Sequence, residues 1–522
     1  MAGKRGRSVS PEKHDKPEEA KPASKARKTT TEGDQVVASS LRDTVTAMSL
    51  TASNGGQAAV GNKRRSTSPG KQDNPKRVIA SSKASKTARA DDEEFEVDDS
   101  GRFAKVKGFP RFQESKPLKP PLDFMSSSPW VLPTKKNRIA NFDPNIIARD
   151  ALETVVVMHP RLPSLVTAFL EYKRANGSKL EKELYKGMSQ HDLVARLIKQ
   201  RPLHFVQHHD YTVLRDGTSG AMREEWLPVG TAEQHRNTHV FLQDDLSYDE
   251  MMLSSLLGTS GPTFFINTGH RKNCAKINPK APHQDRGIFV GLVGARFAQL
   301  GHMDAACILP PIKTHKNTYF FSKQDPGLTK LFQDFFGGRS DGSEFNLSIY
   351  KGRMRISIET LLLEADDRAA QAGTTAYVQL VGLGLGVWRH EEVEEEQKVW
   401  YVEEGAACLS RLNLKHVTTL EIAWVDVPEK TRLECFKAGK KVGITVLFNK
   451  RDRCAKLNSM ELLVVSWAWD SNSLPGNEYW SGFTDDSDDP AAVCCSTIAE
   501  LHNPYVNPFE HRIKVLQERG RS

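Results

Sequence analysis

The chain has few cysteines and no long apolar run. Its 522 residues include seven cysteines, which are odd in number, scattered and never spaced as Cys-x-x-Cys. A disulfide framework or a zinc module needs paired or regularly spaced cysteines, so we expect neither. No 18-residue apolar stretch occurs and no apolar segment follows Met1, which argues against a membrane span and against secretion. We therefore expect a reduced protein inside the cell, without membrane contact.

A net positive charge is also lacking outside the first segment. Residues 1–90 hold 19 Lys or Arg against 8 Asp or Glu, a net +11, while the whole chain carries +8. Residues 1–100 are poor in large apolar side chains and cannot offset the entropy of ordering, so we predict a disordered basic tail. Its clusters at Lys4–Arg7, Lys25–Lys28 and Lys63–Ser66 indicate binding to a nuclear import receptor or to polyanions. A tail that only aids solubility is the alternative, so the location is nuclear or cytoplasmic.

The rest of the chain divides into two predicted regions. Residues 101–222 predict an extended strap followed by a helical extension, because Pro144–Leu203 places apolar residues at helical spacing throughout. Residues 223–515 predict a mixed α/β region in which near-continuous apolar strands alternate with helices. That pattern favours a largely parallel sheet covered on both faces. The acidic run His390–Gln397 is typical of a solvated loop.

The most informative segment is Ala468–Trp480, AWDSNSLPGNEYW. It follows the apolar run Leu462–Trp467, so its polar residues should emerge at the carboxyl end of a core strand, where ligands bind in open α/β sheets. A helix opening at Asp488 or Asp489 follows. Carboxylates gathered there suit acid–base work at a glycosidic carbon, contacts to ribose hydroxyls, or a divalent cation. An Asx turn and helix capping are the structural alternatives. The candidates are Asp470, Asn472, Gly476, Asn477, Glu478 and Asp488 or Asp489.

A glycine run ends another predicted strand. Gly382, Gly384 and Gly386 precede Val387 and Trp388, and glycines there let backbone amides approach a phosphate closely. The run fails as a dinucleotide fingerprint, since Val387 stands at the sixth position. Close helix–sheet packing is the alternative. A third polar turn, Asn267–Asn273, follows the segment Pro262–Ile266 and is either a second edge of the site or a satisfied turn.

Three of these segments together resemble one family. VGLGLGVW, VVSWAWDSNSLPGNEYW and SDDPAAVCCSTIAELHNP are similar to the MavL-like family of divergent macrodomain ADP-ribosyl hydrolases, related to poly(ADP-ribose) glycohydrolase. The resemblance covers about residues 140–510. It implies a macrodomain-like mixed sheet flanked by helices, with a permuted strand order because the glycine loop precedes the acidic loop. Its founding bacterial member removes ADP-ribose from arginine on ubiquitin.

The resemblance also implies roles for individual residues. Asp470, Glu478 and Asp489 match the family's three acidic residues, although Glu478 stands where a shorter Asp is expected and Asp488 competes with Asp489. We expect an ADP-ribosyl hydrolase acting on modified protein side chains, most of all arginine. The alternatives are a non-catalytic reader of ADP-ribose and a chromatin-associated scaffold. No cofactor is expected, and the sequence leaves open whether a divalent cation binds. The expected partner is ADP-ribose or an ADP-ribosylated protein. The residues implied to bind the ligand are Asn472, Gly476, Asn477, Gly382, Gly384, Gly386, Val387 and Trp388.

Overall fold

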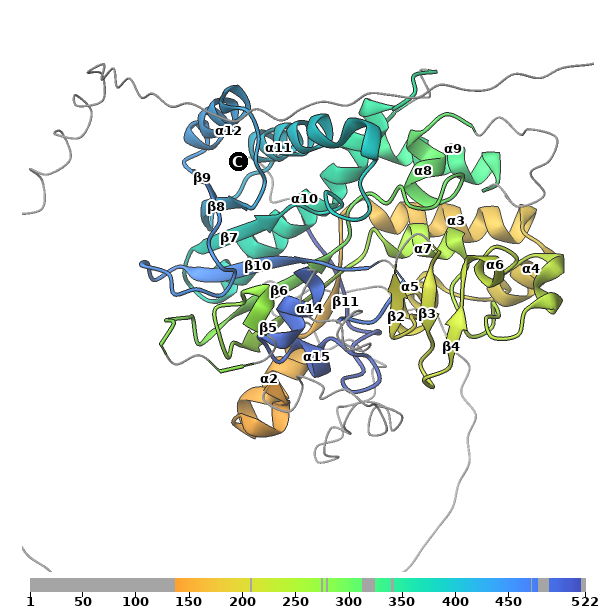
Figure 1. Cartoon of the computed structure of the whole chain (residues 1–522), viewed down its shortest axis with the longest axis horizontal. Coiled ribbons are helices and arrows are strands. Elements are labelled where there is room, and N and C mark those ends of the chain that lie inside the picture. Colours follow the sequence, from red (N-terminus) through yellow and green to blue (C-terminus); the bar gives the residue numbers. More distant parts are fainter. Residues whose placement is uncertain are drawn as a thin grey trace, which may run out of the picture. The chain divides into compact units, whose positions relative to one another are not determined.

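A computed structural model of the chain describes residues 137–206, 209–273, 276–277, 280–311, 324–338, 342–470, 472–476 and 488–517 (Figure 1). The predicted basic tail and strap, residues 1–136, lie outside these residues. So do Asn477 and Glu478 of the acidic segment.

An eight-stranded mixed sheet forms the centre of the fold, in the order β11-β1-β5-β6-β10-β7-β8-β9. Strands β6, β10, β7, β8 and β9 are mutually parallel, β5 is antiparallel to both β6 and β1, and β11 runs parallel to β1. The predicted mixed α/β class is therefore confirmed. The strands are β1 (Val155–Met158), β5 (Gly258–Phe264), β6 (Arg286–Leu292), β7 (Ala376–Val381), β8 (Val417–Ala423), β9 (Thr445–Asn449), β10 (Leu462–Ala468) and β11 (Ile513–Val515).

Helices cover both faces of the sheet, as the continuous apolar strands require. Every residue of β1 and of β7 is buried, which needs apolar partners on two sides. Figure 1 shows α10 (Leu347–Gln371), α11 (Glu394–Arg411) and α12 (Glu429–Lys441) along one face. On the other face lie α2 (Pro144–Glu153), α14 (Asp488–Cys494) and α15 (Ile498–Leu501).

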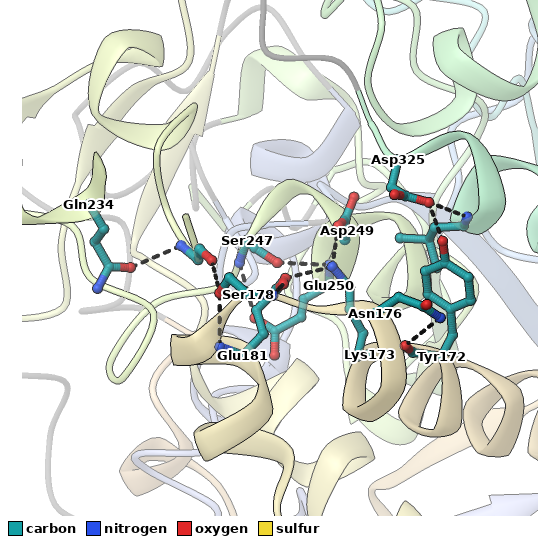
Figure 2. A network of polar contacts seen from close by, with 12 residues as sticks. Tyr172, Lys173, Asn176, Ser178, Glu181, Gln234, Ser247, Asp249, Glu250 and Asp325 are labelled. Atoms are coloured by element: carbon teal, nitrogen blue, oxygen red, sulfur yellow. Dashed lines mark hydrogen bonds and ion pairs between the residues drawn. The ribbon is translucent and has the colours of Figure 1, made fainter. Parts of the chain in front are cut away.

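A helical region with a small three-stranded sheet adjoins the central sheet. It contains α3 (Leu162–Asn176), α4 (Lys179–Tyr185), α5 (Gln190–Lys199), α6 (Arg223–Trp226), α7 (Tyr248–Ser254), α8 (Met303–Ile308), α9 (Pro326–Phe336), β2 (His204–Val206), β3 (Tyr211–Val213) and β4 (Ser219–Ala221). Capping boxes at Ser178, Ser189 and Ser247 start α4, α5 and α7. Figure 2 shows how buried Lys173 of α3 joins α4 and α7 through ion pairs with Glu181 and Asp249.

Two sequence predictions are wrong in detail. The helix predicted through VVVM stops at Glu153, and these residues form β1, because stiff branched side chains suit a buried strand between β5 and β11. The acidic run predicted as a loop instead forms a 3-10 turn (Glu391–Val393) and the first turn of α11. Carboxylates there are favoured by the helix dipole, and Glu394 also pairs with Arg389 and Lys398.

The cysteine expectation is matched as far as the structure describes the chain. Six cysteines, Cys307, Cys408, Cys435, Cys454, Cys494 and Cys495, are buried free thiols. In the same residues, no helix combines the length and the apolar character that crossing a bilayer demands.

Candidate active site

The two predicted loops leave neighbouring strands at one edge of the sheet. β10 pairs in parallel with β7 on one side and with β6 on the other, although it follows both in sequence. The glycine run after β7, the acidic segment after β10 and the segment Val293–Phe297 after β6 therefore all emerge at the same carboxyl edge. This is where an open α/β sheet binds its ligand.

The first part of the glycine run packs closely against the segment after β6. Gly384 has φ 74°, and a Cβ there would lie 2.7 Å from the carbonyl oxygen of Ala295. Gly294 meets it from the other side, since its own Cβ would lie 2.2 Å from the amide nitrogen of Gly384. The amide of Phe297 also donates to the carbonyl of Trp388 at 2.9 Å. The alternative of close packing thus holds for Gly384.

The end of the glycine run is open instead. A Cβ on Gly386 would meet nothing within 4 Å, and the Val387 side chain is 77% exposed. Gly382 lies between these extremes, because a Cβ there would lie 3.2 and 3.3 Å from the Leu385 and Val425 side chains. The backbone from Gly386 onward is therefore accessible to a ligand.

The acidic segment after β10 is held by its own contacts. Trp469 donates through its indole Nε1 to the carbonyl of Ser473 at 3.0 Å. The amide of Leu474 donates to the carbonyl of Pro202 at 2.7 Å, and Gly476 adopts φ 82°. Asp470, at the start of this segment, is half-buried. These hydrogen bonds hold the segment in a defined turn at the end of β10.

Asn472 is a buried polar residue of the acidic segment. Its side chain is fully buried, and neither its amide oxygen nor its amide nitrogen has a hydrogen-bond partner among the described residues. Leaving a buried polar group unsatisfied costs about 1–3 kcal/mol, so such a group calls for an explanation.

The remaining predicted acids are only partly placed. Asp488 and Asp489 begin α14, as the helix-opening pattern predicted, but their side chains are outside the described residues. Glu478 and Asn477 are outside them altogether. The catalytic assignments of Asp470, Glu478 and Asp489 therefore stay predictions.

Three residues near this edge were missed by sequence reasoning. Arg201, two residues after α5, and Arg296, after β6, are both buried and both interact electrostatically with Asp470. Trp424, directly after β8, is 55% exposed and has φ 61°. A bulky residue in the left-handed region is strained, and such strain clusters at functional sites. No sequence spacing marks these residues, because they come from separate elements.

The polar turn Asn267–Asn273 lies at the opposite edge. It follows β5, which runs antiparallel to β6, so it leaves the sheet beside Arg286 at the start of β6. The side-chain oxygen of Asn267 accepts from the amide of Gly269 at 2.9 Å and from Asn273 at 3.2 Å. The satisfied-turn alternative is the one that the structure supports.

A metal centre finds no support in the described part of the chain. No group of three His, Cys, Asp or Glu residues there is arranged to hold an ion. Since the side chains of Glu478 and Asp489 are not among these residues, the question of a divalent cation stays open.

Comparisons with known proteins identify the family. The family described as ADP-ribosylhydrolase MavL-like matches residues 121–343 and 315–515. The chain belongs to this family. It is also similar to two Drosophila melanogaster proteins, both named ADP-ribosylarginine hydrolase. CG2909 is 32% identical over 425 residues, covering 74% of this chain and 82% of the relative. CG3568 is 33% identical over 385 residues, covering 67% and 75%.

Membership decides between two of the earlier alternatives. The chain is a hydrolase of the ADP-ribosyl class and not merely a reader of ADP-ribose. The recognition made from the glycine run, the acidic segment and the acid-led helix is confirmed. All three segments fall inside the matched residues.

Proposed function

We propose that this MavL-like hydrolase cleaves the glycosidic bond between the distal ribose of ADP-ribose and an arginine side chain of a protein. Two relatives named for this linkage, each matching most of the chain, support the proposal. The observation that carries it is the buried amide of Asn472 beside Asp470 at the carboxyl edge of the sheet, which finds no hydrogen-bond partner in the part of the chain that the structure describes. Ribose hydroxyls offer both the donors and the acceptors that such an amide needs.

The two loops would divide the substrate between them. Backbone amides of Gly386 and Val387 would hold the diphosphate, since glycines let a phosphate approach the backbone, while Gly382 and Gly384 would set the shape of the loop by packing. Trp388 closes this loop. Trp424 presents a half-exposed ring at the same edge, where an adenine base could stack. This arrangement, with β10 between β6 and β7, supports a macrodomain-like sheet with permuted strand order.

The reaction itself would fall to the three acids. Asp470 and Asn472 would bind the distal ribose, while Gly476 and Asn477 shape the loop. Glu478 and Asp489 would orient a water molecule and accept its proton as the hydroxyl adds to the anomeric carbon. The bond between the anomeric carbon and the arginine nitrogen breaks, and the leaving guanidino group takes up the proton that the carboxylate accepted from the water. Acid–base assistance of this kind contributes roughly 10²–10⁴-fold.

The test is release of free ADP-ribose by the full chain from proteins modified on arginine, serine or glutamate. We expect turnover on the arginine linkage alone. Ubiquitin modified on arginine is the first protein substrate to try, because the family resemblance suggests it. Glu478→Gln should lower kcat by about 10²–10⁴-fold and retain ADP-ribose binding. Release from serine or glutamate instead of arginine would refute the linkage assignment, and no release at all would refute the proposal.

The basic tail carries a separate part of the proposal. Its clusters would bind a nuclear import receptor or polyanions, and deleting residues 1–100 should change location without reducing hydrolysis. Fluorescence microscopy of a tagged full chain beside the deletion tests this. An unchanged distribution would leave solubility as the role of the tail.

A further inference from the structure

Two buried arginines contact the loops of the predicted site, Arg201 at Trp469 beside Asp470 and Arg296 at Trp388. Arg201 follows α5 by two residues, Arg296 lies in the segment after β6, and each has a relative exposure of 1% or less. Asp470 is an electrostatic partner of both. Buried arginines are rare unless they are paired, so this arrangement calls for a reason.

Arg201 is packed against the acidic segment but is left partly unpaired. Its guanidinium carbon lies 3.8 Å from the centre of the Trp469 ring, next to Asp470 in sequence. Its Nε donates to the carbonyl of Leu197 at 2.9 Å, and its Nη2 donates to the hydroxyl of Ser254 at 2.6 Å. Its Nη1 has no hydrogen-bond partner among the described residues.

The cost of burying the positive charge of Arg201 is only partly offset by nearby acidic groups. Burial lowers the pKa of Arg201 to about 9, and Asp470 is the group that opposes this shift. Arg196, one turn earlier on α5, differs because it forms a buried ion pair with Glu250 at 2.7 Å. Arg201 forms no such ion pair with a carboxylate among the described residues of the helical region. Asp470 is the acidic group that stabilises its positive charge.

Arg296 links the other two loops of the site. It forms an ion pair with Asp210, whose second carboxylate oxygen accepts from the hydroxyl of Tyr248. Its guanidinium carbon lies 5.1 Å from the centre of the Trp388 ring, at the end of the glycine run. Burial opposes its charge, but Asp210, Tyr248 and Asp470 together raise the pKa of Arg296. It remains a cation beside Asp470.

We propose that Arg201 and Arg296 are positioning residues that keep Asp470 ionised and oriented toward the ribose of the substrate. Two cations nearby stabilise the carboxylate form over the carboxylic acid. Asp470 therefore accepts hydrogen bonds and balances the positive charge that develops on the sugar ring, and it does not act as the general acid. This rests on the proposed function, which places the ribose at Asp470.

The test compares pH profiles of kcat/KM for the full chain and its Arg201→Met variant on an arginine-linked substrate. Without the cation, Asp470 takes up its proton at higher pH, so the acid limb should move up by about one pH unit or more. Near neutral pH, kcat/KM should fall roughly tenfold. The position of the limb does not depend on how much of the variant is folded. An unmoved limb would overturn the proposal.

Two control variants separate charge from packing. Arg201→Lys keeps the charge and should keep the acid limb in place while lowering kcat. Arg196→Met removes a buried arginine of the preceding helix α5 that pairs with Glu250, so it should lower thermal stability and leave the limb unmoved. If the limb of Arg196→Met moves as far as that of Arg201→Met, the effect comes from packing and the proposal fails.

A measurement that needs no activity keeps this proposal distinct from the proposed function. Asp470→Asn leaves the two arginines without their shared anion, so it should lower the unfolding temperature of the otherwise unchanged chain. The same change in an Arg201→Met background should lower it less, because one of the cations is gone. Equal effects in both backgrounds, or no destabilisation, would overturn the proposal even if the wild type proves active. If Arg201→Met does not fold, stabilisation or no change by Asp470→Asn alone overturns it.

Discussion

Replacing Gly384 with alanine tests whether the glycine run is shaped by packing as well as by the ligand. The residue has φ 74°, which costs a non-glycine residue about 1–2 kcal/mol. Its new Cβ would also lie 2.7 and 2.8 Å from the carbonyl oxygen and amide nitrogen of Ala295, which are backbone atoms with no freedom to rotate away. Overpacking of this kind typically costs about 1–3 kcal/mol. Together the two effects give roughly 2–5 kcal/mol.

Gly386→Ala is the matched control. It lies two residues along the same loop, and its Cβ would meet nothing within 4 Å. We expect thermal unfolding to show a midpoint several degrees lower for Gly384→Ala and almost unchanged for Gly386→Ala. Because Gly384 packs against Gly294, the new side chain should displace the glycine loop. The KM of Gly384→Ala for an ADP-ribosylated substrate should therefore rise as well. Equal midpoints for the two variants would refute the packing argument.

Two further predictions concern Trp424 and His502. Trp424→Gly relieves the strain of φ 61° and removes a ring on which a base can stack, a contact worth about 1–3 kcal/mol. KM should therefore rise roughly tenfold without loss of thermal stability; an unchanged KM would exclude the stacking role. Burial lowers the pKa of His502 from 6.5 to about 3, so the unfolded chain binds a proton more readily than the folded one. The resulting stabilisation is present above pH 6.5 and is lost as the pH falls, by about 2 kcal/mol at pH 5. Denaturant unfolding at pH 5 and at a pH above 6.5 should show this loss of unfolding free energy in the wild type and not in His502→Gln. His235 is exposed, so the control variant His235→Gln should behave as the wild type does.

The sequence predicted the sheet edge better than the site that stands on it. Apolar runs followed by turn residues located β7 and β10, and the glycine run and Asp470 do leave adjacent strands. The strand β1 was missed because Val155–Met158 continues the helical spacing of α2, and a short apolar run has no period of its own. Tertiary pairing with β5 and β11 then decides its structure.

The arginines show why part of a site escapes sequence patterns. Arg201 follows a helix in which apolar core positions alternate with charged residues. Nothing near it in the chain distinguishes it from Arg196, which is also buried but has Glu250 as its partner. What distinguishes them is the arrival of Trp469 and Asp470 from the far end of the chain. Only the fold brings those together.

The helical region therefore belongs to the chemistry of this hydrolase as well as to its core. Arg201 and Asp210 both precede residue 223, where the α/β region was expected to begin, yet one contacts the acidic segment and the other holds Arg296. The carbonyl of Pro202 also fixes the amide of Leu474 in that segment. A truncation that removes these residues should abolish hydrolysis even though it spares every predicted catalytic acid. The sheet supplies the edge, and the helical region sets the charge that Asp470 carries there.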